Sequence, residues 1–136
     1  MHQETCEITT TLRQQIIDVM PQIQRFLAGC GPTHSGILLV FSPHTTAGVM
    51  INEKTDPHVR TDILEHMRRL VPKDAGFTHA EGNSDAHIKT MLTGVSVQIP
   101  VVSGKPLLGT WQTVYFIDYD GPRKRELLLT FLRKGE

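Results

Sequence analysis

The sequence predicts an α+β fold, a mostly antiparallel, sandwich-like β-sheet with two to three short helices packed on it. Three observations support this prediction. Strand-like alternation dominates both ends of the chain, helix-like spacing is confined to the middle, and no internal repeat or linker interrupts residues 1–136. A chain of this length buries roughly two thirds of the surface that it exposes when unfolded, so we expect a single domain over residues 1–136.

The first elements are expected to be two strands and a helix. Residues Glu7–Val19 mix Thr and Ile in short alternating runs, which predict two strands. After Pro21, apolar residues recur at helical spacing up to Leu27, and Gly29 and Gly31 predict the end of this helix.

The middle of the chain predicts a buried strand followed by a longer helix. Gly36–Phe41 is an apolar run between Gly-Pro and Ser-Pro pairs, which predicts a central strand buried on both faces. Asp56–Pro57 predicts a helix start, because the carboxylate accepts first-turn N–H groups and proline loses no hydrogen bond there. We expect this helix to reach about Val71, with Leu70 on its buried stripe and Arg60 on its solvated face.

The C-terminal half predicts a short helix and three strands. The helix spans Ser84 to about Leu92, and alternation in Val95–Ile99 predicts the strand that follows. Thr113–Tyr119 and Leu127–Leu132 read as strands, and the turn residues Asp120–Pro122 between them predict a hairpin.

Composition excludes several classes of protein. The 14 basic and 14 acidic residues balance, so the charge pattern expected of a nucleic-acid binder or an anionic-membrane binder is missing. Near-zero net charge also favours self-association. The two cysteines, Cys6 and Cys30, cannot form a disulfide framework, the N-terminus does not resemble a secretory signal, and no apolar run approaches the roughly 20 residues of a membrane span. We therefore expect a cytoplasmic protein with free thiols.

Polar residues gather first at the end of the predicted central strand. Ser42–Thr46 follows that strand directly, so His44 and Thr45 are well placed to face a cleft from a rigid support. The alternative is a capped turn with a hydrogen-bonded histidine. Further along, Asn52 and Asp56 crowd polar groups before the helix, although helix capping alone explains Asp56.

The segment Thr78–Lys89 carries two imidazoles, two carboxylates, an amide and an ammonium. Asn83 is expected to cap the short helix, whose free N–H groups favour a phosphate, and Asp85 lies in its first turn. No nearby acidic run is evident for Lys89, so we expect its ammonium to contribute to anion binding. The alternative is an exposed lysine on a short helix.

Three histidines are candidates for an open, catalytic-type metal site. His79 lies on a loop, His87 on a helix and His44 at a strand end, and a divalent ion such as zinc takes this kind of ligand set. Their spacing matches no compact metal signature, so a hydrogen-bonded network is the alternative. A rival set spaced i, i+4 and i+8 runs from His58 to His66, where a solvated helix face is the simpler interpretation.

The only tryptophan lies in Gly109–Gln112, directly before a predicted strand. Trp111 is suited to wall a pocket or stack on a heteroaromatic ring, with core packing as the alternative. The chain has no P-loop, dinucleotide fingerprint, nucleophile elbow or His-Glu-x-x-His helix, so ordinary dehydrogenases and nucleotide hydrolases lack support.

Taken in order, five motifs resemble the YjbQ family of small proteins. They are Pro43–Ala47, Ile51–Glu53 with Asp56–Pro57, Asn83–Lys89, Gly109–Gln112 and the closing turn Asp120–Arg123, and they span nearly the whole chain. The resemblance implies a compact sandwich-like α+β fold and a homotrimer with pockets near subunit boundaries. For some members it also implies a secondary thiamine-phosphate synthase activity, which joins a pyrimidine diphosphate to a thiazole phosphate and expels diphosphate.

That reaction assigns roles to the candidate residues. Trp111 and Asp85 would surround a cationic intermediate, while Lys89, the helix start at Asn83 and a divalent metal, zinc or magnesium, would hold the diphosphate. Two alternatives stay open, a metal-dependent hydrolase of a small metabolite and a non-catalytic trimer that binds one. The candidates are Asn52, Asp56, Asp85 and Lys89 for catalysis, Thr45, Asn83, Trp111 and Gln112 for substrate binding, and His44, His79 and His87 for metal.

Overall fold

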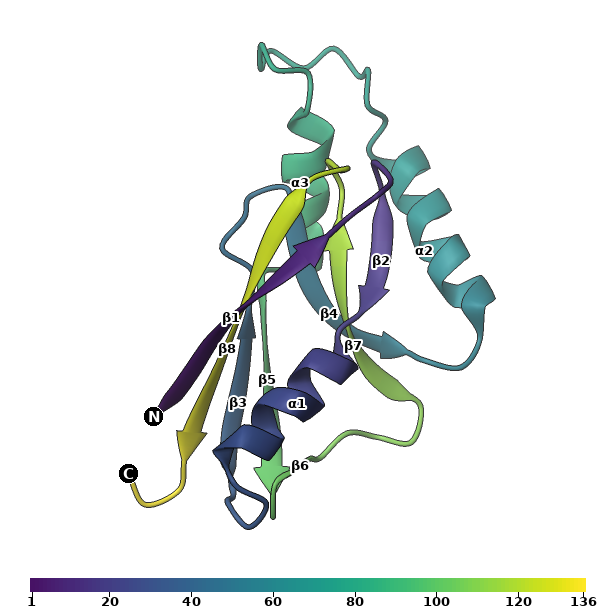
Figure 1. Cartoon of the computed structure of the whole chain (residues 1–136). Coiled ribbons are helices and arrows are strands. Elements are labelled where there is room, and N and C mark those ends of the chain that lie inside the picture. The colour runs from purple at the N-terminus through teal and green to yellow at the C-terminus, as the bar shows by residue number, and fades with distance from the viewer.

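The computed structural model describes residues 1–136 as eight strands and three helices (Figure 1). The predicted α+β class is confirmed, and every strand pair is antiparallel. None of the helices is both long and apolar enough to cross a membrane. The elements are β1 (His2–Thr9), β2 (Gln15–Asp18), α1 (Met20–Cys30), β3 (Gly36–Phe41), β4 (Ala47–Glu53), α2 (Pro57–Leu70), α3 (Ser84–Thr93), β5 (Ser96–Val102), β6 (Lys105–Pro106), β7 (Gln112–Asp118) and β8 (Lys124–Arg133).

Two sheets and the helices make up the layers of the molecule. Strands β1-β8-β3-β5-β6 form one sheet and β2-β7-β4 form the other. Alternating residues of both sheets, such as Leu38 of β3 and Phe116 of β7, share one core with α1, which contributes Ile23, Phe26 and Leu27. The apolar positions in α1 follow the helical spacing of the sequence, and this spacing directs them all into the core.

Strand β7 lies in the middle layer and is buried on both faces. Phe116 faces the main core, whereas Ile117 and Tyr119 face a smaller core with Ala86 of α3 and Met67 of α2. Thr113 to Asp118 are all buried as a result. Helices α2 and α3 therefore cover the face of the three-stranded sheet that points away from the five-stranded sheet.

The prediction that β3 is buried on both faces is wrong for the single chain. Leu38 and Val40 are buried, but Ile37 is 46% exposed and Phe41 is 36% exposed, because no element of the chain covers the outer face of the five-stranded sheet. The helix α2 also differs from expectation. Leu70 is 57% exposed rather than buried, and Arg60 is half-buried, with its guanidinium donating to the Tyr115 hydroxyl at 3.0 Å.

The predicted C-terminal hairpin is wrong as well. β7 and β8 belong to different sheets, and the turn at Asp120–Pro122 carries the chain from one sheet to the other. The connection from β1 to β2 also carries the chain from one sheet to the other. The two connections lie side by side, because the backbone N–H of Thr10 donates to the Arg123 carbonyl. Turn chemistry alone favoured a hairpin, but strand pairing is decided by which faces are buried.

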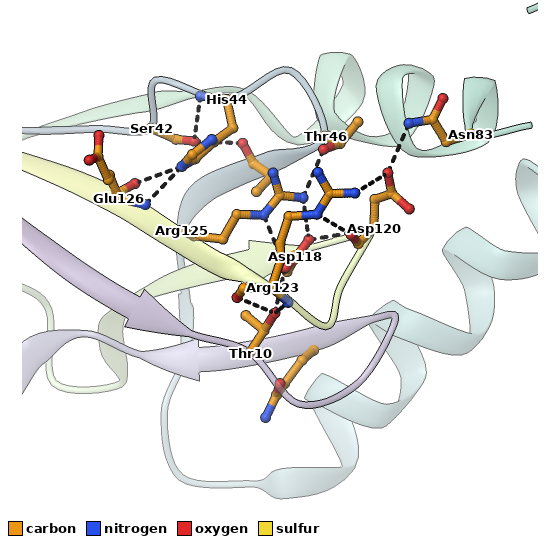
Figure 2. Close-up of polar contacts among 12 residues, drawn as sticks. Thr10, Ser42, His44, Thr46, Asn83, Asp118, Asp120, Arg123, Arg125 and Glu126 are labelled. Atoms are coloured by element: carbon orange, nitrogen blue, oxygen red, sulfur yellow. Dashed lines mark hydrogen bonds and ion pairs between the residues drawn. The ribbon is translucent and has the colours of Figure 1, made fainter. Parts of the chain in front are cut away.

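A buried ion pair joins the two sheets at these crossings (Figure 2). The Arg125 guanidinium of β8 lies 2.7 Å and 3.1 Å from the Asp118 carboxylate oxygens of β7, and both side chains are almost fully buried. Thr10 donates to Asp118 at 2.7 Å, and Thr46 accepts from Arg125 at 2.8 Å. Burial raises the pKa of Asp118, but the hydrogen bonds from Arg125, the Asp120 N–H and Thr10 outweigh it and hold the pKa below its ordinary value.

We predict that Arg125→Met lowers the free energy of unfolding by about 3–5 kcal/mol, because it leaves the Asp118 carboxylate buried without a counter-charge. Urea denaturation followed by circular dichroism measures this change. Arg123→Met is the matched control, since Arg123 is half-exposed and pairs with Asp120 at the surface, where such pairs contribute under about 1 kcal/mol. Equal effects of the two substitutions would contradict a special role for the buried pair.

Candidate functional site

The loop between β3 and β4 holds His44 in one orientation (Figure 2). The buried Ser42 hydroxyl donates to the Ala47 carbonyl at 2.7 Å and accepts from the His44 N–H at 3.4 Å, which closes the turn. The His44 Nε2 accepts from the backbone N–H of Glu126 in β8 at 2.8 Å, and its ring meets Phe116 edge-on at 6.4 Å. The imidazole is therefore fixed from both sides.

The environment of His44 favours a neutral ring. Burial lowers the pKa of His44, and the nearby Arg125 guanidinium lowers it further. Nε2 can accept from the Glu126 N–H or donate to the Glu126 carbonyl, and the tautomer of the neutral ring decides between the two. A metal bound at Nε2 would have to displace the Glu126 backbone, so Nδ1 is the ring nitrogen left to contact a ligand.

Helix α3 faces His44 across a cleft of about 490 Å³. His44, Thr45, His87 and Thr90 supply its polar lining, and we call this cavity the His44–His87 cleft. Thr90 is only 3% exposed, and its hydroxyl has no hydrogen-bond partner. A buried hydroxyl without a partner costs free energy, which a ligand in the cleft would recover by bonding to it.

Two features position α3 over β4. A Cβ on Gly48 would collide with the carbonyl oxygen of Gly94, so only glycine lets the end of α3 rest on this strand. The Val49 N–H donates to the same carbonyl at 3.1 Å. Gly94 itself has a φ of 98°, a conformation that suits glycine at a helix end.

The three histidines proposed as metal ligands are only partly brought together. His79 and His87 lie with ring centroids 5.6 Å apart, and His87 shares the cleft with His44. No group of three or more His, Cys, Asp or Glu side chains in the chain is placed to hold a metal ion. The rival residues His58, Asp62 and His66 are all exposed on α2. A zinc or magnesium site stays a prediction.

Asp85 and Lys89 lie on the other face of α3 and are fully buried. The Lys89 ammonium donates to Asp85 at 2.8 Å, and Arg13 donates to both oxygens of the same carboxylate at 3.0 Å and 3.1 Å. The expectation that no acidic group occupies Lys89 is wrong, because residues four apart on a helix share a face. Burial raises the pKa of Asp85, but the bonds from Arg13 and Lys89 outweigh it and lower the pKa overall.

Asn83 stands at the start of α3 but does not cap it. Its side-chain amide donates to Asp120 at 2.8 Å instead and ties the helix to the crossing between β7 and β8. The side-chain oxygen of Asn83 is buried without a partner. Figure 2 shows Asn83 reaching from α3 toward Asp120, which Arg123 also contacts.

The remaining candidates lie at the opposite end of the three-stranded sheet. Asp56 caps α2 by accepting from the His58 N–H at 2.9 Å, as the simpler interpretation predicted, and Asn52 is half-buried on β4. Trp111 is 62% exposed, so core packing does not explain it. Gln112 pairs with Glu53 at the far end of β4, about 20 Å along the strand from Ala47 by the usual rise per residue. Within one chain, these residues do not reach the His44–His87 cleft.

Sequence reasoning missed Thr90, Arg13 and the Glu126 N–H. Thr90 follows His87 by three residues, a spacing that places both on one helix face and is the only signal for it. Arg13 is 72 residues from Asp85 in the chain, and the Glu126 contact uses backbone, so neither leaves a pattern in the sequence.

A family model, relatives in sequence and solved structures all indicate the same family for this chain. Residues 4–134 match the family described as UPF0047 protein YjbQ-like. A UPF0047 protein of Methanocaldococcus jannaschii is 45% identical over 93% of this chain and 91% of its own length, and YugU of Bacillus subtilis is 42% identical over 90% and 92%. A crystal structure of an uncharacterized YjbQ/UPF0047 protein from Clostridium acetobutylicum superposes with a TM-score of 0.91 at 41% identity, covering 95% of this chain and 99% of that one. A hypothetical protein from Aeropyrum pernix gives 0.92 at 36% identity, covering 97% and 98%.

We predict that His44 titrates below its ordinary pKa of 6.5 and makes stability pH-dependent. The unfolded chain binds a proton at this residue below pH 6.5, whereas the folded chain does not until its lower pKa is reached. The stabilising contribution of the neutral His44 ring is therefore complete above pH 6.5 and is lost as the pH falls from there toward the pKa of the folded chain. NMR titration of the ring protons measures the pKa directly. The free energy of unfolding, measured with urea at several pH values, should change less with pH in His44→Gln than in the exposed control His58→Gln. An equal pH dependence in the two variants would contradict a lowered pKa for His44.

Proposed function

Because the chain belongs to the YjbQ/UPF0047 family, we propose that it is a small cytoplasmic enzyme that binds a phosphorylated substrate in the His44–His87 cleft. The proposed reaction is of the thiamine-phosphate synthase type. The bond between a pyrimidine methylene carbon and its diphosphate breaks, the nitrogen of a thiazole phosphate forms a bond to that carbon, and diphosphate leaves. The observation that carries this proposal is the buried, unpartnered Thr90 hydroxyl in a cleft that His44 and His87 also line.

The charges in the cleft suit a cationic intermediate. Loss of diphosphate leaves a positive charge on the pyrimidine methylene, which an imidazolium nearby would oppose. Burial lowers the pKa of His44, so this ring is neutral at physiological pH, and in its Nδ1-protonated tautomer it can donate to the substrate without adding positive charge. The Thr90 hydroxyl can then bond to a ring nitrogen or amine of the pyrimidine.

A divalent metal, zinc or magnesium, would supply counter-charge to the diphosphate in this proposal. His79 and Glu81 lie 3.8 Å apart and His87 adjoins His79, so nitrogen and oxygen donors are present at the edge of the cleft. They do not form a three-ligand group within one chain. The steps assigned to His44 and Thr90 do not require the metal.

We also propose that the protein is a homotrimer. The outer face of the five-stranded sheet carries Ile37, Phe41 and Leu132, which are between 36% and 49% exposed. Ile37 pairs directly with Leu132 across β3 and β8, so these side chains form a continuous apolar row. A second copy would bury this row, and a neighbouring subunit would also give the exposed Trp111 a partner.

We expect thiamine phosphate to form when the protein is mixed with hydroxymethylpyrimidine diphosphate, thiazole phosphate and Mg²⁺, as measured by chromatography and diphosphate release. Thr90→Val should raise KM by about tenfold, which corresponds to one lost hydrogen bond. The same substitution should leave folding unchanged, because the hydroxyl has no partner in the chain. The exposed substitution His58→Gln is the control and should match wild type.

Other outcomes of this assay would support a different class of protein. Hydrolysis of either substrate without condensation, abolished by a chelator, would indicate a metal-dependent hydrolase. Saturable substrate binding without any product would indicate a non-catalytic metabolite-binding trimer. A Thr90→Val variant that is indistinguishable from wild type would remove the cleft from the proposal.

For the assembly, we expect light scattering to give three times the chain mass of 15.2 kDa. Phe41→Glu places a charge on the apolar row and should shift the protein toward monomer, because burying an unpaired carboxylate is costly. Leu70→Glu, at a more exposed apolar position on α2, is the control and should leave the mass unchanged. A monomer mass for wild type at micromolar concentration would contradict the trimer.

A further inference from the structure

A second cavity of about 510 Å³ opens on the opposite side of α3 from the His44–His87 cleft. Its wall combines residues that are distant in sequence, including Arg13 after β1, Arg68 on α2, Lys73 beyond α2 and Lys89 on α3. We call it the Arg13 pocket. Lys89 lies on the side of α3 toward this pocket, with Asp85 buried beneath it, whereas His87 lines the cleft on the other side of the helix.

The charges around the Arg13 pocket do not cancel. The four cations face only two carboxylates, Glu65 in the wall and Asp85 beneath it. Asp85 is shared by Arg13 and Lys89, and Glu65 is held by Arg68 at 2.6 Å. The hydrogen bond from Arg68 lowers the pKa of Glu65, so both carboxylates are charged at neutral pH. Two positive charges remain.

Donors for a ligand remain available in this wall. Each terminal nitrogen of Arg13 donates one N–H to Asp85, and its remaining N–H groups form no hydrogen bond in the chain. The Arg13 side chain is 30% exposed, so a ligand can reach it. Lys73 is exposed and forms no ion pair in the chain. Lys89 has no exposed surface, so it acts through its charge beneath the pocket rather than by contact.

We propose that the Arg13 pocket binds the dianionic phosphate group of a small phosphorylated metabolite. A phosphate monoester carries close to two negative charges and three acceptor oxygens, which match the two residual positive charges and the unused guanidinium donors. The cavity volume suits a small molecule, and the zero net charge of the whole chain disfavours a polyanion such as nucleic acid. This site is separate from the His44–His87 cleft and does not depend on the reaction proposed for that cleft.

Calorimetric titration of inorganic phosphate and of diphosphate into the full chain tests the pocket with two substitutions of opposite sign. Lys73→Met removes an exposed, unpaired cation and should weaken phosphate binding by about tenfold, as for one lost charge-assisted contact. Glu65→Gln removes a competing carboxylate and releases Arg68, so it should strengthen binding severalfold. Lys134→Met, which removes an exposed cation near the C-terminus far from α2 and α3 (Figure 1), is the control and should bind like wild type.

The outcomes distinguish this site from the cleft. Lys73 and Lys134 are exposed and Glu65 is half-buried, so circular dichroism is used to verify that all three variants fold. If Lys73→Met and Glu65→Gln both bind phosphate as wild type does, the inference is overturned. If phosphate binding is instead lost in His87→Gln, the anion lies in the His44–His87 cleft, and the proposed function survives while the Arg13 pocket does not.

Discussion

The ion pair between Asp118 and Arg125 is the interaction on which the rest of the structure depends. It joins β7 of one sheet to β8 of the other at the point where the chain changes sheets, and Thr10 ties the second crossing to the same carboxylate. Charges buried this deeply are tolerated only when their hydrogen-bonding capacity is satisfied, and here Thr46, Thr10 and the Asp120 N–H complete the set. The same network borders the cleft, because the next residue after Arg125 offers its N–H to His44. Sheet packing and site geometry therefore share one polar centre.

Helix α3 is the element that gives the molecule two chemically different surfaces. One side presents His87 and Thr90 to a cleft with a neutral imidazole, and the other places Asp85 and Lys89 beneath a cationic pocket. This division follows from helical geometry, since residues two apart point in nearly opposite directions and residues four apart share a face. A sequence segment dense in polar residues thus becomes two separate environments.

The sequence was a good guide wherever local physics decides the outcome. The strand Gly36–Phe41 has the predicted bounds, and Asp56 caps α2 because a carboxylate before Pro57 suits a helix start. It was a poor guide where tertiary packing decides. The turn at Asp120–Pro122 looked like a hairpin because turn residues do not encode which sheet receives each strand. Likewise, Lys89 was expected to bind an anion, but its ammonium pairs with Asp85, and Arg13, 72 residues away in the sequence, completes this buried cluster. The i, i+4 spacing of Asp85 and Lys89 is the only part of the cluster that the sequence shows.

The order of strands in the larger sheet has a consequence for synthesis of the protein. β8 lies between β1 and β3, so β1 has no partner, and β3 has only β5, until Lys124–Arg133 has left the ribosome. Before β8 is made, β1 and one edge of β3 lack a strand partner, and the side chains of the future core, including Ile8 and Leu38, lack part of their packing. Such non-local pairing slows folding, and exposed edges invite association with other chains. The incomplete chain is therefore more prone to associate with other chains than the finished fold, in which β8 pairs with both strands.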